Sequence, residues 1–208
     1  DKAKAKSIES FNRATYNKVL SPVGDALPDG IGGREAAKYA HKALSDRYDS
    51  ILSQMPTTVD QQFGAQARFI GQKIGSLPES NAAQFSRIVK DNLVRHFDAN
   101  GNMAGEQMKT SVSELGRLGA KYRGSQSAGE QEMGDLILQL QTAVKGLAAR
   151  GNPQMAGELK NVDKAWAMYT RTRSAASSLG AEDGVFTPAQ LLNAVKASDK
   201  SGSKAAFS

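Results

Sequence analysis

Two histidines are the residues in this chain whose chemistry most directly suits catalysis or metal binding. His41 and His96 each lie within an expected helix, and neither has a second histidine or a cysteine near it in sequence. Asp46 and Asp49 follow His41, but their spacing places neither carboxylate cleanly on the same helical face. A triad or a metal site needs partners at defined geometry. We therefore interpret both histidines as surface or half-buried imidazoles.

Two turn segments resemble ion-binding loops in part. Asp98-Ala-Asn-Gly-Asn102 begins like a calcium loop, but Met103 and Lys109 stand where that loop needs glycine and a bidentate carboxylate. We expect a tight turn there, in which Asn and Gly adopt positive φ. The glycine-rich segment 29–33 lacks the strand and the Gly-Lys-Ser/Thr ending of a phosphate loop. It is either a flexible connector or an anion site at the next helix start.

Glu182 and Asp183 form an acidic pair, but they precede the helix start at Thr187, where negative charge favours the helix dipole. No partner acid or nucleophile accompanies them. The chain also contains no cysteine, which excludes disulfides and thiolate metal ligands. We therefore predict a protein that is not an enzyme, with no catalytic residue, no cofactor and no metal.

The elements that position these residues are helices, because apolar residues recur at helical spacing along most of the chain. The fold class that we predict is all-α, an antiparallel multi-helix bundle of about seven helices with a long αα-hairpin over 128–179. The expected helical segments cover 4–20, 34–55, 59–77, 81–97, 105–123, 128–149, 153–179 and 188–198. Capping boxes are predicted at Thr58 with Gln61, Ser127 with Glu130, and Thr187 with Gln190; Ser80 and Asn152 are predicted as further N-caps, and Gly180 as a C-cap.

Three parts are expected along the chain. Residues 1–20 form an N-terminal helix that serves as a linker or an arm, 34–179 form the helical bundle, and 185–208 form a C-terminal helical segment. The chain begins with aspartate rather than methionine and ends within an expected helix. We therefore expect it to be a piece of a longer protein, with the last segment continuing further.

Lysines gather at both ends of the chain, which has a net charge of +6. A solvated surface explains them, or contact with the phosphates of a nucleic acid; the candidate phosphate contacts are Lys2, Lys4, Lys6, Lys196, Lys200 and Lys204. Trp166 and Tyr169 share a helical face and belong either to the core or to an interface, since Trp and Tyr often anchor binding. Phe186 is a third candidate interface residue. No apolar run is long enough to span a membrane.

The last quarter of the chain resembles a helical region near the C-terminus of phage and prophage internal virion proteins, the DNA-transfer or ejection proteins. An earlier stretch, Leu20 to Gly24 with Ala36-Ala37 and Tyr48, resembles the same region. The residues that carry the closer resemblance are Ala175-Ala176, Leu179-Gly180, Gly184-Val185-Phe186-Thr187-Pro188, Gln190-Leu191, Ala194-Val195 and Lys200-Ser201.

This resemblance implies a structural component of a virion, made in the host cytoplasm and packed inside the phage particle. Its partners would be further copies of itself or other virion proteins, such as portal and ejection proteins, with non-specific DNA as a further partner. The alternative function is a helical DNA-binding module that uses its basic ends. A host-directed effector enzyme is a third hypothesis, for which two isolated histidines offer little chemistry.

Overall fold

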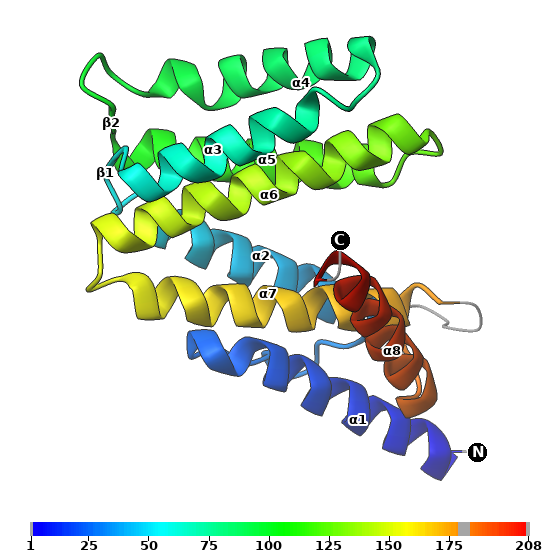
Figure 1. Cartoon of the computed structure of the whole chain (residues 1–208). Helices are drawn as coiled ribbons and strands as arrows, with labels where there is room; N and C mark the ends of the chain where they lie inside the picture. Colours follow the sequence, from blue (N-terminus) through cyan, green and yellow to red (C-terminus); the bar gives the residue numbers. More distant parts are fainter. Residues whose placement is uncertain (1, 179–183, 207–208) are drawn as a thin grey trace. The chain divides into compact units, whose positions relative to one another are not determined.

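The computed structural model describes residues 2–178 and 184–206, and within them the all-α prediction is confirmed (Figure 1). Eight α-helices, two short 3-10 helices and one two-stranded ribbon make up the described part of the chain. They are α1 (Lys2–Leu20), η1 (Ser21–Val23), α2 (Gly33–Leu52), β1 (Thr57–Thr58), α3 (Gln61–Ile74), α4 (Glu79–Asn92), η2 (Val94–His96), β2 (Asn102–Met103), α5 (Gly105–Arg123), α6 (Ala128–Gly151), α7 (Ala156–Ala176) and α8 (Pro188–Ala206).

The chain forms two compact units, and the boundaries fall within α2 and α7. Unit 1 comprises residues 1–48 and 160–208, and unit 2 comprises 49–159. The expected division kept 34–179 in one bundle, whereas the contacts join 34–48 to both ends of the chain. The expected αα-hairpin joined 128–149 to 153–179. In the structure, however, α7 belongs to unit 1 from Lys160 onward. Within unit 2, the most extensive helix pair is α5 with α6.

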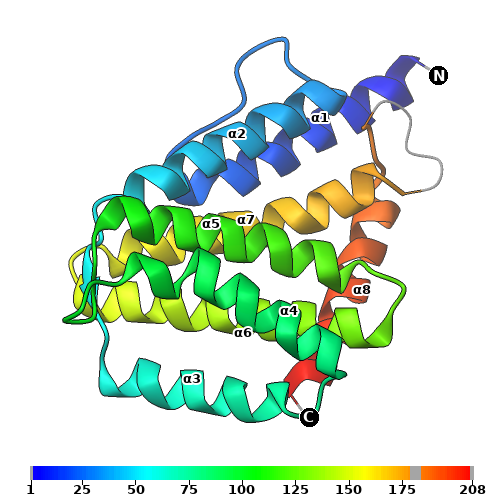
Figure 2. The same ribbon diagram turned by 90° about the horizontal axis from the view of Figure 1, so that it is seen from above.

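Unit 2 is built on that α5–α6 pair, against which α3 and α4 pack (Figure 2). Glycines let the two helices approach closely, since a Cβ on Gly134 would lie 2.3 Å from the Arg123 backbone nitrogen. The Gln141 side chain donates a hydrogen bond of 2.9 Å to the Val112 carbonyl. Apolar side chains from both helices fill the core, among them Met108, Val112, Leu115, Met133, Ile137 and Val144.

The two short strands of unit 2 pair antiparallel, with Thr57 opposite Met103 and Thr58 opposite Asn102. This pairing explains why one predicted capping box is wrong. The Thr58 hydroxyl donates to Asn102 Oδ1 at 2.7 Å in the ribbon, and α3 begins three residues later, at Gln61. Asp60 is its N-cap, and the Asp60 carboxylate accepts from the Phe63 amide at 2.7 Å.

Other helix starts divide between confirmed and wrong predictions. The Thr187–Gln190 box forms in both directions, because Gln190 N donates to Thr187 Oγ1 at 3.3 Å and Thr187 N donates to Gln190 Oε1 at 2.7 Å. Ser127 caps α6, but the Glu130 carboxylate accepts from the Ser125 hydroxyl instead of reaching back. Ser80 is no cap, since α4 begins at Glu79 behind Pro78. Gly180 lies outside the described residues.

Unit 1 buries the C-terminal half of α1 together with residues of α2, α7 and the segment before α8. Its core includes Tyr16, Leu20, Ala36, Ala40, Leu44, Val162, Ala165, Tyr169, Ala175 and Phe186. The loop after η1 is held by polar tethers. Asn17 Oδ1 accepts from Leu27 N at 2.8 Å, and Arg13 donates to the Leu27 carbonyl at 2.9 Å. Among the helices of the described ranges, none has the length and apolar character needed to cross a bilayer.

Candidate functional site

A surface pocket of unit 2 lies where the ribbon meets the end of α6. It has a volume of about 780 Å³ and opens widely to solvent. The residues with polar side chains that line it are Thr57, Thr58, Asp60, His96, Asp98, Asn102, Gln107 and Arg150. These residues come from four separate stretches of the sequence, which the ribbon and the α6 terminus bring together.

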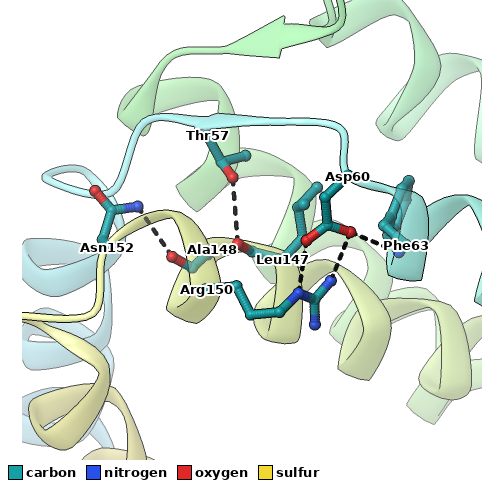
Figure 3. Close-up of polar contacts among 7 residues, drawn as sticks. All are labelled: Thr57, Asp60, Phe63, Leu147, Ala148, Arg150 and Asn152. Atoms are coloured by element: carbon teal, nitrogen blue, oxygen red, sulfur yellow. Dashed lines mark hydrogen bonds and ion pairs between the residues drawn. The ribbon is translucent and has the colours of Figure 1, made fainter.

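Two of these lining residues, Asp60 and Arg150, form an ion pair (Figure 3). Arg150 Nε and Nη2 donate to the two carboxylate oxygens at 2.6 and 3.0 Å. The hydrogen bond from Arg150, followed by the backbone hydrogen bond from Phe63, holds the pKa of Asp60 below its usual value. One carboxylate thus caps the start of α3 and fastens it to the last turn of α6, where a cation also suits the helix dipole. Both oxygens of the Asp60 carboxylate therefore accept hydrogen bonds that hold α3 and α6 together.

Two further side chains satisfy the carbonyl groups at the end of α6 (Figure 3). Thr57 Oγ1 donates to the Leu147 carbonyl at 3.3 Å, and Asn152 Nδ2 donates to the Ala148 carbonyl at 2.9 Å. Asn152 also donates to the Pro56 carbonyl at 2.8 Å. The prediction that Asn152 is an N-cap is therefore wrong. It is the C-cap of α6, and α7 begins only at Ala156.

His96 belongs to the same pocket and contacts a hydroxyl. His96 Nδ1 lies 2.8 Å from Ser111 Oγ, but Ser111 is 0% exposed, so no substrate carbonyl reaches that hydroxyl in this conformation. Arg95 Nε lies 3.3 Å from His96 Nε2, where a triad would place a carboxylate. Burial, and next the charge of Arg95, lower the pKa of His96. This pair lacks the geometry of an activated nucleophile.

The Asp98 segment is the tight turn that the sequence predicts. Asp98 Oδ1 accepts from the backbone amides of Asn100 and Asn102, each at 2.8 Å, and Gly101 has φ of 76°. The hydrogen bonds from Asn102 lower the pKa of Asp98. Its carboxylate oxygens are thus used within the turn. Across residues 2–178 and 184–206, no three His, Cys, Asp or Glu side chains cluster closely enough to hold a metal ion.

A second feature of unit 2 is an apolar groove between α3 and the α4–η2 segment, here called the α3–α4 groove. Its volume is about 500 Å³. Leu140 of α6 also lines it, and Val59 and Val94, which are 42% and 55% exposed, lie along it. Phe69 on α3 is 55% exposed, with Lys73 Nζ 4.9 Å from its ring centroid. These are large apolar side chains that folding leaves in contact with water.

In unit 1 the predicted interface residues lie mostly inside. The Trp166 ring packs against His41, Tyr48 and Tyr169, with centroid distances of 5.5, 6.4 and 5.7 Å. Trp166 is half-buried, whereas Tyr169 is 4% exposed. The Tyr48 hydroxyl donates to Asp163, and burial raises the pKa of Tyr48. Tyr169 is therefore core rather than an interface anchor, because its ring closes the seam between α2 and α7.

Phe186 is likewise a core residue, and its interface prediction is wrong. It is 1% exposed, and its ring lies 6.0 and 6.2 Å from the rings of Phe11 and Tyr16. The Asn12 side chain donates to the Phe186 carbonyl at 2.6 Å and accepts from its amide at 3.1 Å. A buried asparagine thus pairs with the backbone of a segment that lies 174 residues away in sequence.

The candidate phosphate contacts are exposed wherever their side chains are described. Lys2, Lys4 and Lys6 project from the first turns of α1, and Lys196 from α8. The side chains of Lys200 and Lys204 lie outside the described part, as do Glu182 and Asp183.

Comparison of the chain with protein-family models, with curated proteins and with solved structures gave no match.

Val59 is 42% exposed, although the sequence pattern places it on the buried face of its helix. Phe69 and Val94 were not singled out from the sequence, although a signal was present for Phe69. Phe69 adjoins Ile70 on α3, which packs inward. Adjacent helical residues point about 100° apart, so the second member of such a pair leaves the buried face. Two neighbouring large apolar residues in a short amphipathic helix therefore indicate an exposed apolar side chain.

Proposed function

We propose that this chain is a non-catalytic structural module of a phage virion protein, internal to the particle or ejected with the genome, acting through helix–helix contacts. Two observations support the proposal beside the all-α fold. The segment from Ala175 to Ser201 resembles the C-terminal region of such proteins. The α3–α4 groove offers the kind of surface that an assembling helical protein needs, and this observation carries the proposal.

The groove suits an amphipathic helix. Its floor is apolar, and Val59 and Val94 keep much of their surface in water. A partner helix that placed apolar residues at i, i+3 and i+4 in the groove would cover both. Fully burying a valine or phenylalanine contributes about 1.5–3 kcal/mol relative to leaving it exposed. Lys90 lines the groove and Lys73 lies beside Phe69, so the partner's polar edge would carry acidic residues.

Self-association is the simplest form of this contact, and light scattering after size-exclusion chromatography tests it. We expect the purified chain to form oligomers whose mass increases with concentration, and we expect Val94→Asp to reduce them. Leu192→Asp is the matched control, since Leu192 is 53% exposed on α8 in unit 1.

A chain that stays monomeric at every concentration, and is missing from the parent phage particles when they are imaged by cryo-electron microscopy, contradicts the proposal. Equal loss of assembly in both aspartate variants rejects the groove as the contact surface.

The second candidate function is DNA binding through the basic ends. The observation in its favour is that Lys2, Lys4 and Lys6 are all exposed within the first turns of one helix. Binding that uses phosphates weakens steeply as salt rises, with a slope of about 0.9 per phosphate contact on duplex DNA. Replacing the three lysines with glutamine should lower both the affinity and that slope. Affinity that does not change with salt rejects this function.

A further inference from the structure

The Asp98 turn of unit 2 contains one polar side chain that the fold does not use. Asn100 is exposed, and its side-chain amide has no hydrogen-bond partner among the described residues, which include the whole turn from Asp98 to Met103. Gly101 follows with φ of 76°, and the two residues form the one Asn-Gly pair of the sequence. Asparagine is a thermolabile residue in proteins, so a free Asn100 side chain is a candidate for covalent change.

Asn102 lies in the same turn and is held by two partners. Its Nδ2 donates to Asp98 Oδ2 at 3.0 Å, and its Oδ1 accepts from Thr58 Oγ1 at 2.7 Å. The residue after it, Met103, is buried. The residue after Asn100 is a glycine, whose missing Cβ leaves its backbone nitrogen accessible to the preceding side chain. The two asparagines therefore provide a reactive and an unreactive position within one turn.

We propose that Asn100 is a site of spontaneous covalent modification, which converts it to aspartate or isoaspartate. The Gly101 nitrogen attacks Asn100 Cγ and forms a C–N bond. The Cγ–Nδ2 bond breaks, and Nδ2 leaves as ammonia with the proton of the Gly101 amide. Water from the solvent then opens the five-membered imide at one of its two carbonyl carbons. Opening at the backbone carbonyl gives isoaspartate, whose main chain runs through Cγ, and opening at Cγ gives aspartate.

Asp98 limits the rate of this reaction, because it holds the reacting nitrogen within the turn. The Gly101 amide donates to the Asp98 carbonyl oxygen at 3.0 Å, and this hydrogen bond must break before the nitrogen attacks. Asp98 Oδ1 also accepts from the amides of Asn100 and Asn102, each at 2.8 Å. The reaction therefore proceeds from the fraction of molecules in which the turn has opened locally.

The product alters the pairing of the β1–β2 ribbon. The Val59 amide donates to the Gly101 carbonyl at 2.9 Å, and Thr58 pairs with Asn102. Isoaspartate adds one atom to the main chain before Gly101, which displaces that carbonyl from Val59. The new carboxylate also stands two residues from that of Asp98, and like charges repel. This inference is independent of the proposed assembly function, since it concerns a chemical change within the turn.

Incubation of the intact folded chain at mildly alkaline pH, followed by digestion and mass spectrometry of the peptides, tests the proposal. Aspartate and isoaspartate have the same mass and are separated by chromatography. We expect Asn100 to convert at least about tenfold faster than Asn102, which corresponds to about 1.4 kcal/mol in activation free energy. The rate should rise with pH, because the amide nitrogen attacks after it has lost its proton. Asn100→Gln should abolish the conversion, since a longer side chain forms the ring more slowly.

A second pair of variants tests the role of Asp98. Asp98→Ala removes the side-chain acceptor of the turn, so the conversion of Asn100 should accelerate by about fivefold or more, the ratio that about 1 kcal/mol gives. Asp91→Ala is the matched control, because it removes an exposed carboxylate from α4, outside the turn. It should change the rate by less than about twofold.

Equal conversion of Asn100 and Asn102 in the unmodified chain would overturn the proposal, and that comparison depends on no variant. An Asn100 rate that Asp98→Ala leaves unchanged or lowers would overturn the role of Asp98. The other asparagines in the same digest, such as Asn81 and Asn161, report the state of the fold. They should stay slow in Asp98→Ala, and a common increase at all of them would show that general unfolding, rather than the turn, controls the rate and would also overturn that role.

Discussion

Replacing Gly134 with alanine tests the close approach of α5 and α6 in unit 2. A Cβ at this position would lie 2.3 Å from the backbone nitrogen of Arg123, 2.9 Å from its Cα and 2.9 Å from the Gly119 carbonyl oxygen. All three are backbone atoms, so no side chain can rotate away. The added methyl group must therefore move one helix relative to the other.

Two effects of opposite sign determine the size of the change. Alanine favours an isolated helix over glycine by about 1 kcal/mol. Overpacking a closely packed core costs about 1–3 kcal/mol, and more when backbone must shift. The upper end applies at Gly134 because the contacts are with backbone. We expect Gly134→Ala to lower the free energy of unfolding by about 2 kcal/mol, with a fall in Tm of several degrees.

Gly71→Ala on α3 is the matched control, because a Cβ there meets nothing within 4 Å. It should raise the free energy of unfolding by up to about 1 kcal/mol through helix propensity alone. Urea unfolding followed by circular dichroism at 222 nm measures both variants, with the m-value checked for constancy. The two alanine variants should therefore move the midpoint in opposite directions. A Gly134→Ala protein as stable as Gly71→Ala would refute the helix spacing described for α5 and α6.

Three further predictions concern polar groups. Asp60→Ala should cost about 1 kcal/mol of unfolding free energy at pH 7. Arg150 lowers the pKa of Asp60 in the folded chain. The stability that Asp60 contributes is therefore fully present above its unfolded pKa, near 4, and is lost as pH falls through its folded pKa. A stability difference between the variant and the unmodified chain that stays the same in acid contradicts this prediction. Burial lowers the pKa of His96, so its NMR titration midpoint should lie below about 6.5. The free energy of unfolding should decline as pH falls from about 6.5 through the folded pKa of His96. A midpoint above about 6.5 would contradict this prediction. Burial raises the pKa of Tyr16 to about 12, and its buried hydroxyl has no hydrogen-bond partner in the described chain. Tyr16→Phe should therefore leave the protein equally stable or more stable in thermal unfolding, and a large loss would show that the hydroxyl is satisfied.

Local signals located most helices because their causes are local. A proline ends a helix, and apolar residues at helical spacing continue one, through neighbours only a few residues away. The Thr187–Gln190 capping box likewise forms entirely within its own segment. The Asp98 turn is equally local, since its oxygens bond to amides two and four residues away. Predictions of this kind survive folding when no distant group competes for the same atoms.

Predictions failed where a distant partner took over a polar side chain. Thr58 suits a cap, but strand pairing with Asn102 uses its hydroxyl. Asn152 suits the start of the following helix, but its side-chain amide donates to the carbonyl of Pro56, which lies 96 residues away in sequence. Tyr169 shares a face with Trp166 in any helix, and only the packing of α2 decides that its ring is buried.

The amino-acid sequence alone determined that this chain is helical, where its amphipathic faces run and that cysteine chemistry is absent. These properties depend on backbone geometry and on neighbours within about one helical turn. Tertiary structure alone decided which faces meet. Packing brings together residues that no short-range pattern connects, namely Gly134 with Arg123, Asp60 with Arg150, and Lys38 with Arg173. The groove to which we assign binding arises in this way, because a groove exists only once separate helices have packed.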